Sequence, residues 1–137
     1  MARSETSIWH NFVGHCWTEQ RRGTLQIHLW YAAADPYAVH VLLATRASQT
    51  SVGVVVGRDL LTDGLATPVG EGAVRVAPFT PDRTCLTLHD VAGGLWLLLD
   101  TDDVRRFLAE TYTLVAAGAE ACPSDLDTEL QALTDPT

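Results

Sequence analysis

The residues that could do chemistry in this 137-residue chain are its five histidines, its three cysteines and several paired acids. The most suggestive cluster is DPYAVH, residues 35–40, which places Asp35 close to His40. A histidine beside a carboxylate can serve as a general base near neutral pH. The same residues also suit a corner, because Asp-Pro favours a β-turn. We favour the corner, with His40 as a non-catalytic residue of the strand that follows.

A second cluster, His10, His15 and Cys16, raises the question of a metal site. Consecutive strand residues point to opposite faces, so His15 and Cys16 cannot readily share one ion. A structural zinc site also needs several ligands at short spacing, which the sequence does not offer here. We therefore expect no metal and no cofactor.

Other reactive groups have structural explanations. The cysteines, Cys16, Cys85 and Cys122, lie in apolar or strand-like segments, where cysteine behaves as a small hydrophobe. The acid pairs Asp102-Asp103 and Asp125-x-Asp127 begin predicted helices, where the helix dipole favours negative charge. The sequence contains no GxSxG, Walker or GxGxxG motif. We predict that the protein is not an enzyme; a buried histidine–acid pair at His40 inside a sizeable pocket would revive that alternative.

Length and composition indicate one globular unit. The chain has the size of a single domain, residues 1–137, and 47% of its residues are apolar. Charged residues, glycine or proline interrupt every apolar run, and the N-terminus lacks a signal-peptide stretch. Three widely spaced cysteines do not form a secreted disulfide framework. We expect a cytoplasmic protein that does not insert into a membrane.

Net charge argues against a nucleic-acid partner. The net charge is −8, and residues 100–137 hold nine acids against two arginines. Nucleic-acid binders normally cluster positive charge, because phosphate contacts supply much of their affinity. The acidic segment instead either steers basic partners or keeps the protein soluble, and its candidate residues for steering are Asp125, Asp127 and Glu129.

Hydrophobic alternation predicts a mostly antiparallel β protein. Period-two patterns indicate strands near residues 8–17, 24–31, 38–45, 51–57 and 73–78, and a hairpin over 84–100. Helical spacing indicates one long helix after Asp100 or Thr101, ending by Gly118, and a second short helix after Ser124. Near residue 59 we expect a short helical turn, capped by Asp59 and ended by a left-handed Gly64. The fold class is α+β.

Two tryptophans fall on strand faces opposite the main aliphatic rows. Trp30 and Trp96 belong either to a second core or to an interface, where aromatic residues are enriched. Alternation alone does not distinguish a second core from an interface, and both residues are candidates for partner binding.

Five motifs occur in an order that resembles the SsgA-like proteins, the sporulation and cell-division regulators of actinomycetes. They are DPYAVHVLLAT, VGRDLLTDGL, PVGEGAVRVAP, FLAETYTLVAAGAE and DLDTEL, between about Leu25 and Leu133. The resemblance implies a non-enzymatic protein that acts in septum-site selection, helps to localise the tubulin-like protein FtsZ and influences peptidoglycan remodelling. It also implies a Whirly-like fold of antiparallel sheets plus helices, assembled as a trimer.

The signature positions that the resemblance carries over are mostly fold-determining. They are Asp35, Pro36, Tyr37, His40, Arg58, Asp59, Leu60, Leu61, Gly64 and Leu65. The chain departs from the family pattern at Val54, where tryptophan is common, at Val56, where an aromatic is usual, and at Gly57, where alanine is usual. The aromatic N-terminal segment IWHNFVGHCW matches nothing in that pattern. These differences indicate a divergent member.

The expected function is therefore recruitment of cell-division or cell-wall proteins by a cytoplasmic homo-oligomer, a trimer or dimer, at division septa. The alternative, by fold analogy, is a single-stranded nucleic-acid-binding protein. That alternative needs a basic groove with stacking aromatics. The tryptophans supply the aromatics, whereas the charge does not fit.

Overall fold

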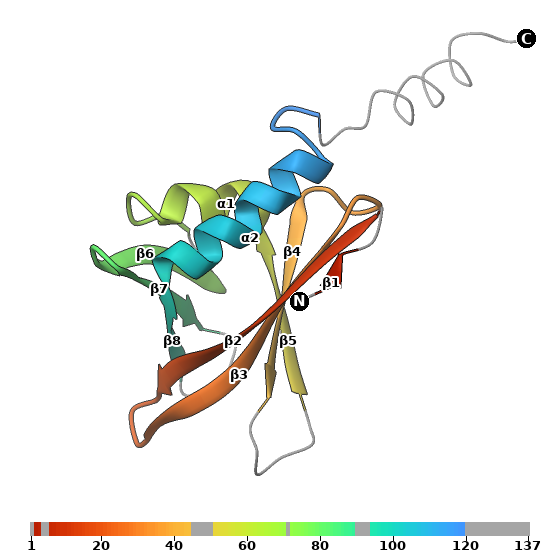
Figure 1. The fold of residues 1–137 in the computed structure, drawn as a ribbon. Coiled ribbons are helices and arrows are strands. Elements are labelled where there is room, and N and C mark those ends of the chain that lie inside the picture. Colours follow the sequence, from red (N-terminus) through yellow and green to blue (C-terminus); the bar gives the residue numbers. More distant parts are fainter. Residues whose placement is uncertain (1, 4–5, 45–50, 71, 90–93, 120–137) are drawn as a thin grey trace, which may run out of the picture.

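The computed structural model describes residues 2–3, 6–44, 51–70, 72–89 and 94–119. Within these residues eight strands form one antiparallel sheet, and two helices lie against its concave side (Figure 1). The strands are β1 (Ala2–Arg3), β2 (Ser7–Trp17), β3 (Arg22–Ala32), β4 (Ala38–Ala44), β5 (Ser51–Gly57), β6 (Val74–Thr80), β7 (Arg83–Leu88) and β8 (Leu95–Asp100). The helices are α1 (Arg58–Gly64) and α2 (Thr101–Leu114).

The sheet has the strand order β5-β4-β3-β2-β8-β7-β6, and β1 pairs with β2 outside this path. The α+β class and the antiparallel pairing predicted from alternation are confirmed. The two long strands β2 and β3 pair along their whole length, from Ser7 opposite Ala32 to Trp17 opposite Arg22. This central pair of long strands is extended by β4 and β5 on one side and by β8, β7 and β6 on the other.

The core lies between the concave side of the sheet and the helices. Every second residue of the strands points inward, as the period-two pattern predicts, and the fully buried set includes Ile8, Ile27, Leu29, Tyr31, Val39, Val41, Leu86 and Leu97. Helix α2 contributes Val104, Phe107 and Leu108 from its buried face. One continuous apolar cluster therefore joins the sheet to both helices.

Helix α2 begins after the first of the two predicted caps, Asp100 and Thr101. The Asp100 side chain accepts hydrogen bonds from the backbone N–H groups of Asp102 and Asp103, which makes it the N-cap. The helix ends at Leu114, four residues before Gly118, and Gly118 instead adopts a left-handed φ of 84° in the turn that follows. The predicted second short helix after Ser124 lies outside the described residues.

The predicted caps of α1 are wrong. The helix starts two residues earlier than predicted, with Gly57 as its N-cap and no side-chain cap, so Asp59 lies inside the first turn. Gly64 is not left-handed; it is the last helical residue and is buried. Its lack of a side chain serves close packing, because a Cβ at this position would collide with Val76 of β6. Among the described residues no helix is long and apolar enough to cross a membrane.

Candidate protein-binding surface

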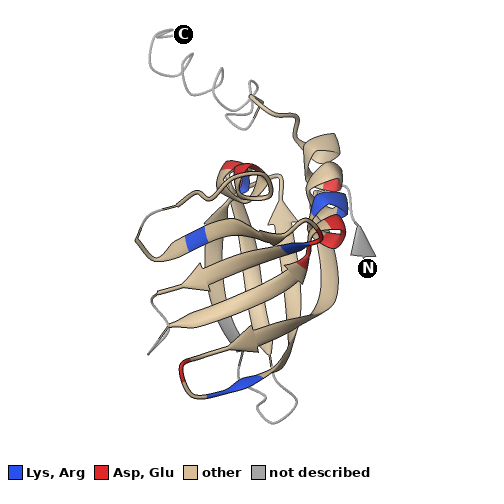
Figure 2. Ribbon diagram, turned by 90° about the vertical axis from the view of Figure 1, so that its left-hand side faces the viewer, with Lys and Arg blue, Asp and Glu red and all other residues tan. Residues whose placement is uncertain are grey.

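The convex side of strands β2 to β5 carries two rows of residues that no described helix covers. Cross-strand pairing aligns the first row, which consists of Trp9, Trp30, His40 and Val55. The second row consists of Asn11, His28, Leu42 and Gly53. We call these eight residues the outer aromatic face. None of them carries a formal charge other than the two histidines when protonated, and in Figure 2 the charged residues cluster on the helices and strand ends.

Contacts within the outer aromatic face hold its rings in place. The Asn11 Oδ1 atom accepts hydrogen bonds from Trp9 Nε1, at 2.6 Å, and from His28 Nδ1. Trp9 packs edge-on against His28, with ring centroids 6.0 Å apart. The Trp30 and His40 rings lie 4.9 Å apart. The face is thus organised before any partner binds, which lowers the entropic cost of association.

Exposure separates this surface from a second core. Trp9 is 43% exposed and Val55 is 56% exposed, whereas Trp30 and His40 are half-buried against each other. Contiguous apolar and aromatic surface of this kind marks interaction sites. Trp30, a candidate from the sequence, lies at its centre.

The DPY corner lies at the rim of the outer aromatic face. Asp35 and Pro36 turn the chain between β3 and β4, as predicted, and the Tyr31 hydroxyl donates to the Pro36 carbonyl at 2.9 Å. Tyr37 is exposed at 57%. The His40 Nε2 and Asp35 Oδ2 atoms are 3.7 Å apart, with side chains 30% and 59% exposed. This histidine–acid pair is therefore exposed to water. It lacks the burial that the enzyme hypothesis requires at His40.

Trp96, the other candidate tryptophan, belongs to a separate aromatic cluster. It stacks on Trp17 with centroids 6.2 Å apart and planes inclined by 7°, and Phe79 packs against Trp17 from β6. Trp17 and Trp96 are half-buried, whereas Phe79 is 57% exposed. The structure does not bring Trp30 and Trp96 together: they occupy different ends of the convex side.

The signature residues of α1 lie on the opposite side of the sheet. Arg58 is 1% exposed, and its guanidinium lies 5.0 Å from the Tyr31 ring centroid and 4.1 Å from that of Tyr112. Its Nη1 donates to the carbonyls of Thr111 and Val115 at the end of α2. Leu61 is buried, Leu60 and Leu65 pack against the core, and exposed Asp59 accepts a hydrogen bond from Tyr112. These contacts make Arg58 the anchor of α2.

The described thiols are not in an activating environment. Burial raises the pKa of the Cys16 and Cys85 thiols, so both are protonated at neutral pH. Among the residues that the structure describes, no group of three or more His, Cys, Asp or Glu side chains is placed to hold a metal ion. Cys122 and the acidic candidates Asp125, Asp127 and Glu129 lie outside the described residues.

Alternation within single strands did not predict Trp9, His28 and Val55 as members of one surface. The signal was present, because each alternates with a buried neighbour, but the rows depend on the cross-strand register, which one strand pattern does not reveal.

Comparison with known proteins identifies the family. The model of the family described as "Streptomyces sporulation and cell division protein, SsgA" matches residues 25–120. The chain belongs to the SsgA family. This membership confirms the family resemblance, and the whole of the aromatic strand β2 lies outside the matched region.

Curated relatives carry the name sporulation-specific cell division protein SsgB. The relative from Kineococcus radiotolerans is 43% identical over 72% of this chain, and the match spans 62% of that protein, less than two thirds of its length. The relative from Salinispora tropica is 42% identical over 77% of this chain and 76% of its own length.

Two solved structures share the fold. One, from work on SsgB mutations and longitudinal cell division during sporulation of Streptomyces coelicolor, is 31% identical with a TM-score of 0.77 over 85% of this chain and 94% of its own. The other, an SsgA-like sporulation-specific cell division protein from Thermobifida fusca, is 29% identical with a TM-score of 0.81 over 95% of this chain and 97% of its own.

Proposed function

We propose that this SsgA-family chain is a non-enzymatic regulator of sporulation-specific cell division. It binds other proteins of the division or peptidoglycan machinery and thereby helps to position the septum, with FtsZ as the division protein that the family resemblance points to. Its place of action is the cytoplasm, at division septa. The names of its relatives support the biological setting, and the outer aromatic face supports the mode of action.

The observation that carries the mode of action is the ordered outer aromatic face, which no described helix covers. A strand face that contacts only water would normally carry charged or small polar side chains. Here tryptophan, valine and leucine occupy these outward positions instead. Apolar side chains on such a face are typical of a surface that contacts another protein. The rings also lie among hydrogen-bonding groups such as Asn11 and His28, a mixture typical of protein interfaces.

The test is a triple substitution of exposed or half-exposed residues, Trp9→Thr, Trp30→Thr and Val55→Thr. Threonine keeps strand propensity while it removes the apolar contact area. We expect a fluorescent fusion of this variant to lose its septal localisation in sporulating host cells and to lose its partners in a pull-down. The control is Gln26→Thr, which changes an exposed residue of β3 outside the face. Unchanged localisation and recovery of the triple variant would contradict the proposal.

We also propose that the chain is one Whirly-like domain that forms a homo-oligomer, a trimer or dimer. Measurement of the solution mass by light scattering tests the assembly directly. A monomer at tens of micromolar would contradict it. If the triple variant keeps the wild-type mass but loses its partners, the outer aromatic face serves the partner and not the oligomer.

The acidic C-terminal segment has a role that can be tested separately. Combined neutralisation of Asp125, Asp127 and Glu129 to Asn or Gln lowers partner recruitment at low salt if the segment steers basic partners. If partner recruitment does not change at any ionic strength, the acidic segment serves only solubility.

The nucleic-acid alternative has one structural feature in its favour. Trp17, Trp96 and Phe79 form a stacking cluster next to Arg22, which shares a cavity with Trp17 and Phe79. The net charge of −8 opposes phosphate binding. We expect titration with single-stranded oligonucleotides at low salt to leave the tryptophan fluorescence unchanged, and tight, salt-sensitive quenching would reverse this ranking.

A further inference from the structure

One edge of β2 is interrupted. On the side opposite β3, this strand pairs with β1 at Ile8 and Trp9 and with β8 from His15 to Trp17. Between these two contacts no described strand pairs with residues 10–14. The open stretch is about 17 Å long at the usual rise of a strand, long enough for a short extended peptide.

The hydrogen-bond register shows which backbone groups this edge leaves open. The β2–β3 ladder is flanked by backbone bonds from Ala33 N–H to the Thr6 carbonyl and from Thr18 N–H to the Arg21 carbonyl. Hydrogen-bonded pairs alternate along an antiparallel ladder, so the even-numbered residues of β2 bond to β3. The N–H and C=O groups of Asn11 and Val13 therefore point to the open edge, and no described backbone group bonds to them.

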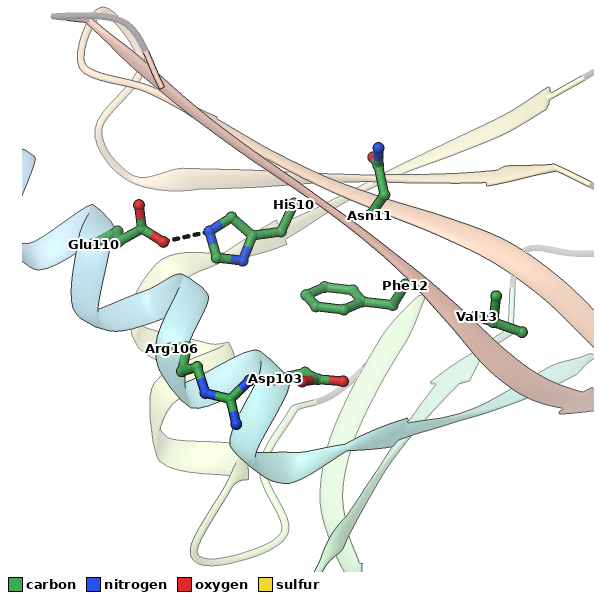
Figure 3. Close-up of a pocket in the computed structure, with 7 residues that line it drawn as sticks. All are labelled: His10, Asn11, Phe12, Val13, Asp103, Arg106 and Glu110. Carbon is green, nitrogen blue, oxygen red and sulfur yellow. Dashed lines mark hydrogen bonds and ion pairs between the residues drawn. The ribbon is translucent and has the colours of Figure 1, made fainter. Parts of the chain in front are cut away.

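Helix α2 turns this edge into a groove. A cavity of about 410 Å³ lies between residues 10–13 of β2 and the helix side chains of Asp103, Arg106 and Glu110. Figure 3 shows His10 and Phe12 directed towards α2, and Asn11 and Val13 directed away from it. Phe12 is half-buried and packs against the core. His10 pairs with Glu110, which fixes α2 beside the strand.

We propose that this groove binds an extended segment of a partner protein, which adds to β2 as a short antiparallel strand. The recognition mode is β-strand addition, in which backbone hydrogen bonds supply affinity and side-chain contacts supply selectivity. The antiparallel direction follows from β1 and β8, because both already pair antiparallel with this same edge. This site adjoins the outer aromatic face, with which it shares Asn11, but it uses the backbone of that residue and goes beyond the function proposed above.

The lining of the groove defines the chemistry of the segment. The residue opposite Phe12 points to the same side of the sheet as Phe12, so an apolar side chain there packs on its ring. The helix wall holds two carboxylates, Asp103 and Glu110, and one guanidinium, Arg106; Arg106 pairs with Asp103 at 3.2 Å, and His10 of β2 pairs with Glu110. The groove therefore selects an apolar residue with basic or neutral neighbours and repels acidic segments.

Hydrogen exchange of the unaltered chain tests the open edge. In the free protein the amides of Asn11 and Val13 exchange rapidly, whereas those of His10 and Phe12, which bond to β3, are protected. Protection of the Asn11 and Val13 amides in the free protein would mean that a second copy or another segment of this chain already covers the edge, and it would overturn the proposal.

Panning of phage-displayed random heptapeptides against the full chain supplies the probe. We expect enrichment of sequences with an apolar residue flanked by Lys, Arg or small polar residues. A synthetic peptide of the enriched sequence then slows exchange of the Asn11 and Val13 amides at least tenfold. Failure to enrich such peptides, or binding that leaves these two amides unprotected, contradicts strand addition here.

A matched pair of variants isolates the backbone contribution. Val13→Pro removes an N–H that β3 does not use, and we expect at least about tenfold weaker peptide binding by fluorescence anisotropy. Val13→Thr keeps the N–H and is expected to bind within twofold of the wild type. Equal affinity of both variants would overturn the proposal, while the triple substitution in the outer aromatic face is expected to leave peptide binding intact, so the two proposals fail independently.

Discussion

The two sides of strands β2 to β5 use the same backbone for opposite purposes. Inward-facing Ile8, Tyr31 and Val56 are fully buried, and their sequence neighbours Trp9, Trp30 and Val55 form one row on the outside. The inner side is aliphatic apart from Phe12, Tyr31 and a few polar groups with partners, and two helices cover it. The outer side is aromatic, contains three hydrogen-bonding side chains and is not covered by any described helix.

The difference between these sides shows what selects each residue type. Aliphatic side chains stabilise the core because burial removes their surface from water without leaving a polar atom unpaired. Tryptophan and histidine combine an apolar ring with a polar atom, which suits a surface that is wet before binding and dry afterwards. We therefore expect the inner side to determine stability, and we propose that the outer side serves recognition.

The largest effect on this comparison is expected from two adjacent leucines of β4. Leu43 is 4% exposed, whereas Leu42 faces outward and is half-buried. We expect Leu43→Ala to lower the free energy of unfolding by about 3 kcal/mol, because it leaves a cavity in the core. Leu42→Ala is expected to cost less than about 1 kcal/mol. Urea unfolding measures both, and equal losses would show that the outer side is packed like a core.

Arg58 is expected to give the next largest effect. Arg58→Leu removes the hydrogen bonds to the Thr111 and Val115 carbonyls and the stacking between Tyr31 and Tyr112. We expect a loss of about 2 kcal/mol. The control is Arg105→Leu, which breaks an exposed pair with Asp102 on the same helix and is expected to cost about 0.5 kcal/mol or less. A similar loss for both arginines in thermal or urea unfolding would remove Arg58 as the anchor of α2.

Two adjacent valines of β5 sharpen the comparison with one identical substitution. Val56→Thr buries a hydroxyl in an apolar site, and we expect a loss of about 1.5 kcal/mol. Val55→Thr places the hydroxyl in water, and its effect on stability is expected to stay within about 0.5 kcal/mol. Denaturant midpoints of the two variants provide the measurement. A larger loss at Val55 would indicate that the outer side is buried in an obligate assembly.

The smallest of these effects concerns the start of α2. Asp100→Ala removes the acceptor for the N–H groups of Asp102 and Asp103 and is expected to cost about 1 kcal/mol. Asn at the same position still accepts these bonds, so Asp100→Asn is expected to keep most of the stability. If Asn and Ala variants unfold at the same urea concentration, the capping bonds do not contribute.

The sequence predicted those features that depend on local patterns. Alternation located the strands around Ile27 and Val41, and the helical pattern placed the cap of the long helix at Asp100 or Thr101, of which the structure selects Asp100. The predicted caps of α1 failed because tertiary packing against Val76 decides the role of Gly64. The outer aromatic face and the groove beside β2 depend on which strands are neighbours and in which register. That information comes from contacts between residues far apart in the chain.

The direct junction between β8 and α2 has a mechanical consequence. Asp100 ends the strand and Thr101 begins the helix, so no linker residue absorbs a movement of either element. A buried bond of 2.7 Å between the hydroxyls of Thr101 and Thr84 ties this junction to β7 as well. A force that tilts α2 is transmitted to the middle of the sheet instead of being lost in a loop, which couples the position of this helix to the spacing of β7 and β8.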